Sequence, residues 1–153
     1  GSYGAIALAL ALLAKVSLLA LIAQSGGAAI AAVALFAGHV TSRLMPLFVI
    51  HTLSHVGDTP RSKSKPLADS IGRAGLAVGV LWWAMAMGLV VALLPTVHWA
   101  QAVLGALLAL WWMWRLLRRR LQGFTGDGLG ATQQLSEIGF LLALALSLPA
   151  AAP

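Results

Sequence analysis

The sequence contains no cysteine and has few charged residues. Without cysteine, a disulfide framework and a thiolate metal site are both excluded. Only 9% of the 153 residues are charged, whereas a soluble domain carries about 25%. Ten Lys and Arg with four Asp and Glu cannot cover the surface of a chain this long in water. The composition therefore excludes a soluble globular domain, a disordered chain and a secreted disulfide scaffold.

Hydrophobic residues make up 60% of the sequence, and they occur in five long runs. The runs cover residues 4–23, 28–50, 74–94, 97–117 and 133–150. A helix that spans a bilayer needs about 20 mostly apolar residues. The runs are continuous and lack the alternation of strands in a membrane barrel. We therefore expect an all-α fold, a polytopic membrane bundle of five transmembrane helices that forms one domain over residues 1–153.

Most of the positive charge lies in the two longer connections, 51–73 and 115–132. With five helices, both connections fall on one side of the membrane, and cytoplasmic loops collect Lys and Arg. The pattern predicts that both connections and the amino end are cytoplasmic and that the carboxyl end is outside. Trp111, Trp112 and Trp114 lie beside the arginines, as in an interfacial aromatic belt. In a soluble protein a net charge of +6 would suggest nucleic acid, but here the basic residues are explained as loop charges that set the membrane orientation. The apolar runs therefore predict a lipid bilayer as the partner and no nucleic acid.

Three ionisable residues lie within the first two runs. Lys15 lies in the middle of the first run, where a charge must face protein, water or the interface. It is either a snorkelling or paired lysine or a ligand of an anionic substrate. His39 and Arg43 are four residues apart, so they share one face of a helix. Arg43 is a candidate phosphate ligand, and the alternative is a structural contact to a carbonyl or carboxylate.

His51 and His55 are also four residues apart, with Asp58 close behind them. This spacing is compatible with a metal site, but it lacks the glutamate of a zinc-protease motif. The segment lies at a helix end in the 51–73 connection, and a solvated surface is the favoured interpretation.

A glycine-rich stretch follows the arginines of the second long connection. Its sequence is Gly123-Phe124-Thr125-Gly126-Asp127-Gly128-Leu129-Gly130-Ala131. Backbone N–H groups in such a stretch can bind an anion, and the positive end of a following helix adds to that field. Asp127 and Glu137 offer hard oxygen ligands for Mg²⁺. The alternative is structural: Asp127 or Thr132 caps a helix and the glycines form a turn.

Residues 119–137 resemble the carboxyl-terminal signature of the cobalamin synthase family, the adenosylcobinamide-GDP ribazoletransferases. They read Arg119-Arg120-Leu121-Gln122-Gly123-Phe124-Thr125-Gly126-Asp127-Gly128-Leu129-Gly130-Ala131-Thr132-Gln133-Gln134-Leu135-Ser136-Glu137. The opening Gly1-Ser2-Tyr3-Gly4-Ala5-Ile6-Ala7-Leu8 with Lys15, and the pair Ser42-Arg43, are similar to other parts of the same family. The resemblance is poor across the 51–73 connection.

The resemblance implies an Mg²⁺-dependent transferase of the bacterial inner membrane, in late cobalamin biosynthesis. Such enzymes join adenosylcobinamide-GDP to α-ribazole or its 5′-phosphate and release GMP. The chain then corresponds to the carboxyl-terminal portion of the family, without the acidic motif of its amino-terminal part. The predicted catalytic residues are Asp127, Arg43 and Lys15, and the predicted metal ligands are Asp127 and Glu137. The predicted substrate-binding residues are Thr125, Gly126, Gly128, Gly130, Arg119 and Arg120.

Two other functions remain open from the sequence. One is a small helical transporter or channel in which Lys15, His39 and Arg43 line a path. The other is a non-catalytic membrane subunit that docks a partner. The sequence leaves the oligomeric state open, including a homo-oligomer.

Overall fold

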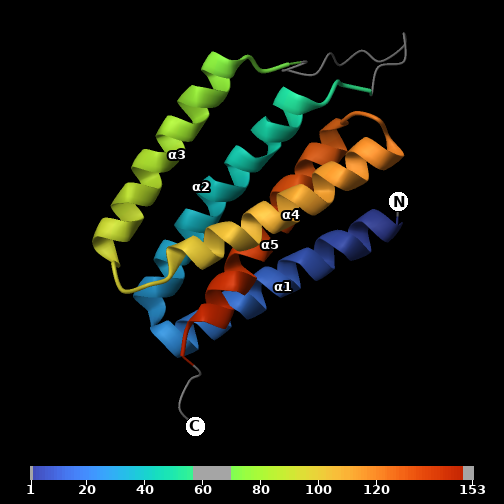
Figure 1. Ribbon diagram of the computed structural model, residues 1–153. Coiled ribbons are helices and arrows are strands. Elements are labelled where there is room, and N and C mark those ends of the chain that lie inside the picture. The colour runs from blue at the N-terminus through green and yellow to red at the C-terminus, as the bar shows by residue number, and fades with distance from the viewer. Residues whose placement is uncertain (1, 57–69, 150–153) are drawn as a thin grey trace.

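The computed structural model describes residues 2–56 and 70–149, which form five helices (Figure 1). The helices are α1 (Ser2–Gly26), α2 (Ala28–Thr52), α3 (Arg73–Leu93), α4 (Trp99–Arg120) and α5 (Gly126–Ser147). Each is long and apolar enough to cross a membrane. The predicted all-α bundle of five spanning helices is confirmed.

The helices run alternately up and down, so their ends gather at two opposite ends of the bundle (Figure 1). One end carries the first residue of α1, α3 and α5 and the last residue of α2 and α4, and we call it the loop end. The other end, called the turn end, carries the short turns α1–α2 and α3–α4. The tightest turn is Gly27, whose φ of 90° lies in the region that favours glycine. The end of α2, the start of α3 and the α4–α5 connection therefore lie at the same end as the start of α1, as the helix count predicts.

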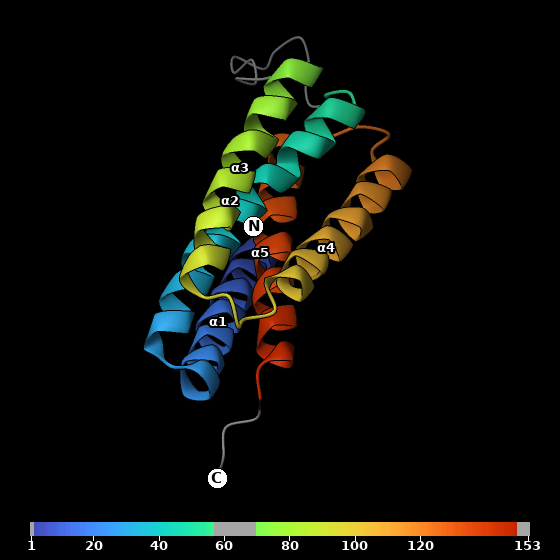
Figure 2. The same cartoon turned by 60° about the vertical axis from the view of Figure 1, so that its left-hand side comes forward.

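Helix α5 packs against three neighbours, α4, α2 and α1, while α3 packs on the outer side of α2 (Figure 2). Its closest neighbour is α4, and two glycines make their crossing possible. A Cβ added at Gly105 would lie 2.2 Å from the carbonyl oxygen of Gly139. A Cβ added at Gly139 would lie 2.5 Å from the carbonyl oxygen of Gly105. Small residues let membrane helices approach closely, and this contact holds α4 against α5.

Apolar side chains cover the outer surfaces of the bundle, most of all on α1 and α3. Leu13 and Val16 of α1 are more than half exposed, as are Leu81 and Trp82 of α3. In water such surfaces would be unstable, but in a bilayer they contact lipid chains that are as apolar as the side chains. The exposed surfaces therefore support the membrane assignment that the composition predicts.

The predicted second connection, 115–132, is wrong in extent. Helix α4 continues through the arginines to Arg120, and α5 begins at Gly126 rather than at residue 133. Only residues 121–125 connect the two helices. Arginine is a good helix former, and a helix N-terminus tolerates glycine when a side chain caps it. Helix α5 also ends earlier than predicted, at Ser147.

Candidate functional site

A buried carboxylate, that of Glu137 on α5, is at the centre of a polar cluster between three helices. Only 3% of its side chain is exposed. The ammonium group of Lys15 on α1 donates to Oε2 of Glu137 at 2.9 Å and also to the side-chain oxygen of Gln134. Gln134 and Glu137 are three residues apart on α5, so both face α1. Of the alternatives for Lys15, the structure shows a lysine that is paired with a carboxylate.

The second side of the cluster comes from α2. Nδ1 of His39 lies 3.5 Å from Oε1 of Glu137, and Nη2 of Arg43 lies 3.3 Å from Nε2 of His39. Because a guanidinium group can only donate, Nε2 of His39 accepts. In a neutral ring the proton is then on Nδ1, where it is directed at the carboxylate. The chain of contacts therefore runs from Arg43 through His39 to Glu137 and Lys15.

The charges of this cluster do not balance. Lys15 and Arg43 are cationic, and Glu137 is the one carboxylate that they share within the described residues. Lys15 is paired with Glu137, while Arg43 is exposed and its one polar contact within the described residues is the ring of His39. Since a charge inside a membrane protein pairs with an opposite charge or faces water, Arg43 can accept an external anion.

The second polar region is the start of α5 at the loop end. Thr125 is the N-cap, and its side-chain oxygen accepts from the backbone N–H of Gly128 at 3.2 Å. The N–H groups of Gly126 and Asp127 belong to the first turn, where no carbonyl within the helix can accept from them. Asp127 follows the cap in that turn, and its exposed side chain makes no hydrogen bond or ion pair within 2–56 and 70–149. Neither Asp127 nor Thr132, which donates to the carbonyl of Gly128, is the cap.

The glycines of this first turn differ in what surrounds them. A Cβ added at Gly126 or Gly130 would meet no atom within 4 Å, so both have open space beside the backbone. A Cβ added at Gly128 would lie 2.8 Å from a methyl carbon of Leu117 on α4. Gly126 and Gly130 are four residues apart and share one helix face. That face can admit a ligand close to the backbone, while Gly128 serves the packing of α5 on α4.

A backbone contact that the sequence does not signal supports the start of α5. The N–H of Phe124 donates to the carbonyl of Ser54 at 2.9 Å, and the N–H of Val56 donates to the carbonyl of Phe124 at 3.0 Å. Phe124 is fully buried, and a Cβ at Gly123 would lie 2.4 Å from the Ser54 carbonyl oxygen. The segment after α2 therefore fixes the segment before α5, which holds the N-terminus of α5 in place.

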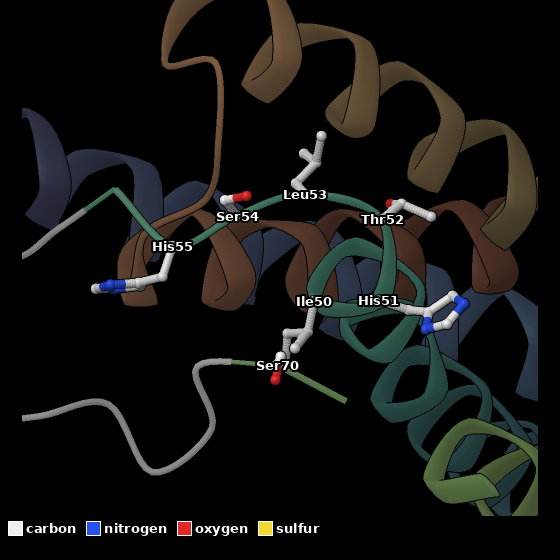
Figure 3. Close-up of a pocket in the computed structure, with 7 residues that line it drawn as sticks. All are labelled: Ile50, His51, Thr52, Leu53, Ser54, His55 and Ser70. Atoms are coloured by element: carbon white, nitrogen blue, oxygen red, sulfur yellow. The ribbon is translucent and has the colours of Figure 1, made fainter. Parts of the chain in front are cut away.

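The histidines of the loop end do not converge. They line an open hollow of about 460 Å³ formed by residues 50–55 and Ser70, and their rings point away from one another (Figure 3). Nδ1 of His51 lies 2.9 Å from the carbonyl oxygen of Ile71, and the ring of His55 packs edge-on against Phe124. Asp58 lies outside the described residues. The arrangement of His51 and His55 gives no support to a metal site.

The two predicted metal ligands, Asp127 and Glu137, lie apart on the same helix. Ten residues of helix separate them by about 15 Å along the axis. Within the described parts of the chain, no three His, Cys, Asp or Glu side chains lie close enough to share an ion. Glu137 is already bonded to Lys15. Of the two carboxylates, Asp127 is the one that remains accessible to a metal ion.

The predicted catalytic residues also occupy two levels of the bundle. Asp127 is at the loop end, whereas Lys15 and Arg43 meet Glu137 and His39 deeper inside, about 16 Å along α5 from its start. Arg119 and Arg120 are exposed in the last turn of α4, one short connection before Thr125. The structure therefore assembles Lys15 and Arg43 into one cluster and places Asp127 with the glycines in another.

Comparisons with a family model and with individual known proteins point to the same family. A family model described as cobalamin-5-phosphate synthase matches residues 1–145. The adenosylcobinamide-GDP ribazoletransferase of Polaromonas sp. (strain JS666 / ATCC BAA-500) is 48% identical over 97% of this chain and 57% of its own length. The proteins of the same name from Albidiferax ferrireducens and Shewanella halifaxensis are 46% and 39% identical over 97% and 94% of this chain, and over 58% and 54% of their own lengths. The chain thus spans little more than half the length of these relatives. No solved structure matches it.

Proposed function

Since the chain belongs to the cobalamin-5-phosphate synthase family, we propose that it forms the membrane part of an adenosylcobinamide-GDP ribazoletransferase of cobalamin biosynthesis. The observation that carries this proposal is that one bundle contains two features suited to binding anions. One is the N-terminus of α5 with its open glycine face, and the other is the cluster with the unbalanced charge of Arg43. Both substrates of the proposed reaction, adenosylcobinamide-GDP and α-ribazole 5′-phosphate, carry phosphate groups.

The proposed reaction is a phosphoryl transfer. A hydroxyl oxygen of α-ribazole, or of its 5′-phosphate, forms a bond to the phosphorus that carries cobinamide. The bond between that phosphorus and the bridging oxygen breaks, GMP leaves with that oxygen, and the hydroxyl proton passes to solvent. Such a transfer depends mainly on positioning the groups and neutralising their charge. The protein therefore needs N–H groups and cations more than a nucleophile of its own.

The start of α5 is the proposed site for the diphosphate. The free N–H groups of Gly126 and Asp127 point out of the helix end, where the helix dipole favours negative charge. The open face of Gly126 and Gly130 lets the diphosphate approach the backbone. Thr125 fixes this turn through Gly128, and Arg119 and Arg120 add positive charge from the end of α4.

The deeper cluster is the proposed site for the phosphate of the second substrate. Arg43 supplies a planar guanidinium that can bind two phosphate oxygens at once. His39 holds Arg43 from one side, and Glu137 holds both His39 and Lys15. In this arrangement Lys15 compensates the charge of Glu137, while Glu137 acts by positioning His39.

Mg²⁺ is part of the proposal, with Asp127 as the ligand from this chain. The ion is often bound through one or two carboxylates together with substrate phosphates. The exposed carboxylate of Asp127 beside the α5 N-terminus fits that requirement. The carboxylate of Glu137 does not, because it already forms an ion pair with Lys15. When bound, Mg²⁺ would neutralise phosphate charge during the transfer.

We also propose that the protein lies in the bacterial inner membrane with its loop end in the cytoplasm. The charge asymmetry carries this part, since Arg115, Arg118, Arg119 and Arg120 are all near the loop end of α4. The start of α5, the proposed diphosphate site, would then lie on the cytoplasmic side of the membrane.

The proposal is tested by measuring GMP release and cobalamin formation from adenosylcobinamide-GDP and α-ribazole 5′-phosphate. The assay uses a protein that has the full length of the relatives and includes residues 1–153. Wild-type protein is expected to form both products in equal amounts. Arg43→Ala should raise the KM for the ribazole phosphate by about tenfold or more, and Arg43→Lys should restore part of it. Absence of both products with correctly folded wild-type protein would refute the function, and equal KM values for all three proteins would remove Arg43 from the site.

A further inference from the structure

The last turns of α4 carry three tryptophans followed by four arginines, and two of the arginines lie against tryptophan rings. The guanidinium carbon of Arg115 is 4.9 Å from the centroid of the Trp111 ring. That of Arg118 is 5.1 Å from the ring of Trp114. Both pairs are four residues apart, so each arginine lies one turn after its tryptophan. These cation–π contacts orient the guanidinium groups, which would otherwise be mobile.

The Trp111 and Arg115 side of this surface faces away from the bundle, whereas the indole N–H of Trp114 donates to Oγ1 of Thr52 on α2 at 3.0 Å. Helix α4 buries Ala102, Ala106, Met113 and Leu117. At about 100° per residue, Trp111 and Arg115 lie on the opposite side of the helix. The Trp111 side chain is 54% exposed. Because α4 is one of the spanning helices, this side of its last turns meets the lipid at the level where the chain leaves the membrane.

The arginines of this surface have no carboxylate partner in the described parts of the chain. Residues 2–56 and 70–149 contain two acidic side chains, Asp127 and Glu137. Glu137 forms an ion pair with Lys15, and neither carboxylate forms an ion pair with an arginine of α4 within the described residues. The positive charge of Arg115 and Arg118 is therefore available to an external anion.

Two open hollows beside these side chains give such an anion room. One of about 410 Å³ is lined by Trp111, Trp114, Arg115, Arg118 and Arg119. The other, of about 450 Å³, lies on the opposite flank of Trp111 and Arg115 and extends to Trp112 and Arg120. Each hollow combines an aromatic wall with guanidinium donors. A phosphate group with an apolar chain attached would satisfy both parts.

We propose that this surface of α4 binds the headgroup of an anionic phospholipid, with the phosphate held between Arg115 and Arg118. Arginine can bind two phosphate oxygens at once, and tryptophan places its ring at the level of the lipid headgroups. A soluble phosphate compound could use the same donors, but the surface faces lipid and lies on the opposite side of α4 from α5. This inference does not depend on the proposed transferase activity.

The test uses nanodiscs of phosphatidylcholine that contain a minority of phosphatidylglycerol, with bromine on the chains of one lipid at a time. Bromine on lipid chains quenches nearby tryptophan fluorescence, and Trp82 and Trp83 of α3 are replaced by phenylalanine because Trp82 is also exposed to lipid, whereas Trp99 is buried. In that background the quenching reports which lipid lies beside Trp111, Trp112 and Trp114. The wild-type protein is expected to show more quenching by brominated phosphatidylglycerol than by the same fraction of brominated phosphatidylcholine. Each of Arg115→Gln and Arg118→Gln should lower the relative affinity for phosphatidylglycerol by about fivefold. The matched control is Arg73→Gln, an exposed arginine at the start of α3, which should leave the preference unchanged.

Three results would overturn the proposal. Equal quenching by the two brominated lipids in the wild type would show that the arginines bind no particular headgroup. An undiminished preference in the folded Arg115→Gln/Arg118→Gln protein would place the lipid elsewhere. Loss of the preference on adding inorganic pyrophosphate, but not on adding sodium chloride of equal ionic strength, would assign the site to a soluble phosphate.

If the double variant does not fold, Arg115→Lys/Arg118→Lys keeps the charge and should lose part of the preference because lysine binds phosphate as a point charge.

Discussion

The ammonium nitrogen of Lys15 lies 2.9 Å from Oε2 of Glu137, and the pair joins α1 to α5 inside the bundle. The residues are 122 positions apart in the sequence, and both side chains are largely buried. Removing one partner would leave the other charged and unpaired in a membrane interior, whereas removing both leaves no buried charge in this pair. The pair should therefore behave as a unit in folding.

This coupling is measurable as a double-mutant cycle. We expect Lys15→Met and Glu137→Gln each to lower the free energy of unfolding by about 2 kcal/mol. The double variant should lose less than the sum, with a coupling of about 1 kcal/mol, as in other membrane proteins. The free energies come from unfolding in mixed micelles of dodecylmaltoside and SDS. Combining Lys15→Met with Arg73→Gln is the control, and a strictly additive result for Lys15 and Glu137 would contradict the pair.

The glycines at the start of α5 separate a packing role from a binding role. Gly126→Ala and Gly130→Ala have space for the new methyl group, so thermal stability should be unchanged or slightly higher. If the diphosphate approaches this face, the same methyl groups should raise the KM for adenosylcobinamide-GDP by about tenfold, a loss of about 1.4 kcal/mol in binding. Steady-state kinetics with varied adenosylcobinamide-GDP provide the measurement.

Gly128→Ala is the matched comparison, because its methyl group would contact Leu117. This variant should lower thermal stability rather than selectively raise KM. Unchanged kinetics in both Gly126→Ala and Gly130→Ala would exclude this face as the diphosphate site.

The sequence predicts the helices better than their ends. Five apolar runs are sufficient to predict five spanning helices, because nothing else satisfies the backbone in a membrane. The start of α5 is harder to predict, since four glycines between Gly123 and Gly130 favour a loop by propensity alone. The signal that points to a helix there is Thr125, a good N-cap residue followed by Asp127 in the first turn.

The candidate site is only partly readable from the sequence for a physical reason. Lys15, Arg43 and Glu137 attract attention individually because charges are expensive in a membrane. Their connection through His39 depends on how α1, α2 and α5 pack, which the sequence pattern does not specify. Gln134 was missed as a member of the cluster, although its spacing of three residues from Glu137 places both on one face. The pairing of Phe124 with Ser54 uses backbone groups alone, so no residue type signals it.

The orientation in the membrane can be tested by reporter fusions at Thr96, in the α3–α4 turn, and at Gln122, in the α4–α5 connection. We expect a fusion at Gln122 to report the cytoplasm and a fusion at Thr96 to report the outside, because arginines accumulate near the loop end of α4. Paired alkaline phosphatase and green fluorescent protein fusions give opposite readouts and control for expression. A cytoplasmic signal at Thr96 together with an external signal at Gln122 would reverse the orientation.

Asp127→Asn tests the central claim most directly, because it removes a charge from the start of α5 while keeping one side-chain oxygen. Thr125 is the cap of this helix, so the substitution should leave thermal stability nearly unchanged. A Mg²⁺ ligand, in contrast, should be an anionic oxygen. The measurement is the rate of GMP release from adenosylcobinamide-GDP at limiting Mg²⁺, in a protein of the relatives' full length. The account predicts a rate lower by about two decades, which corresponds to about 3 kcal/mol of transition-state stabilisation. A folded Asp127→Asn protein with the full wild-type rate at limiting Mg²⁺ would contradict it.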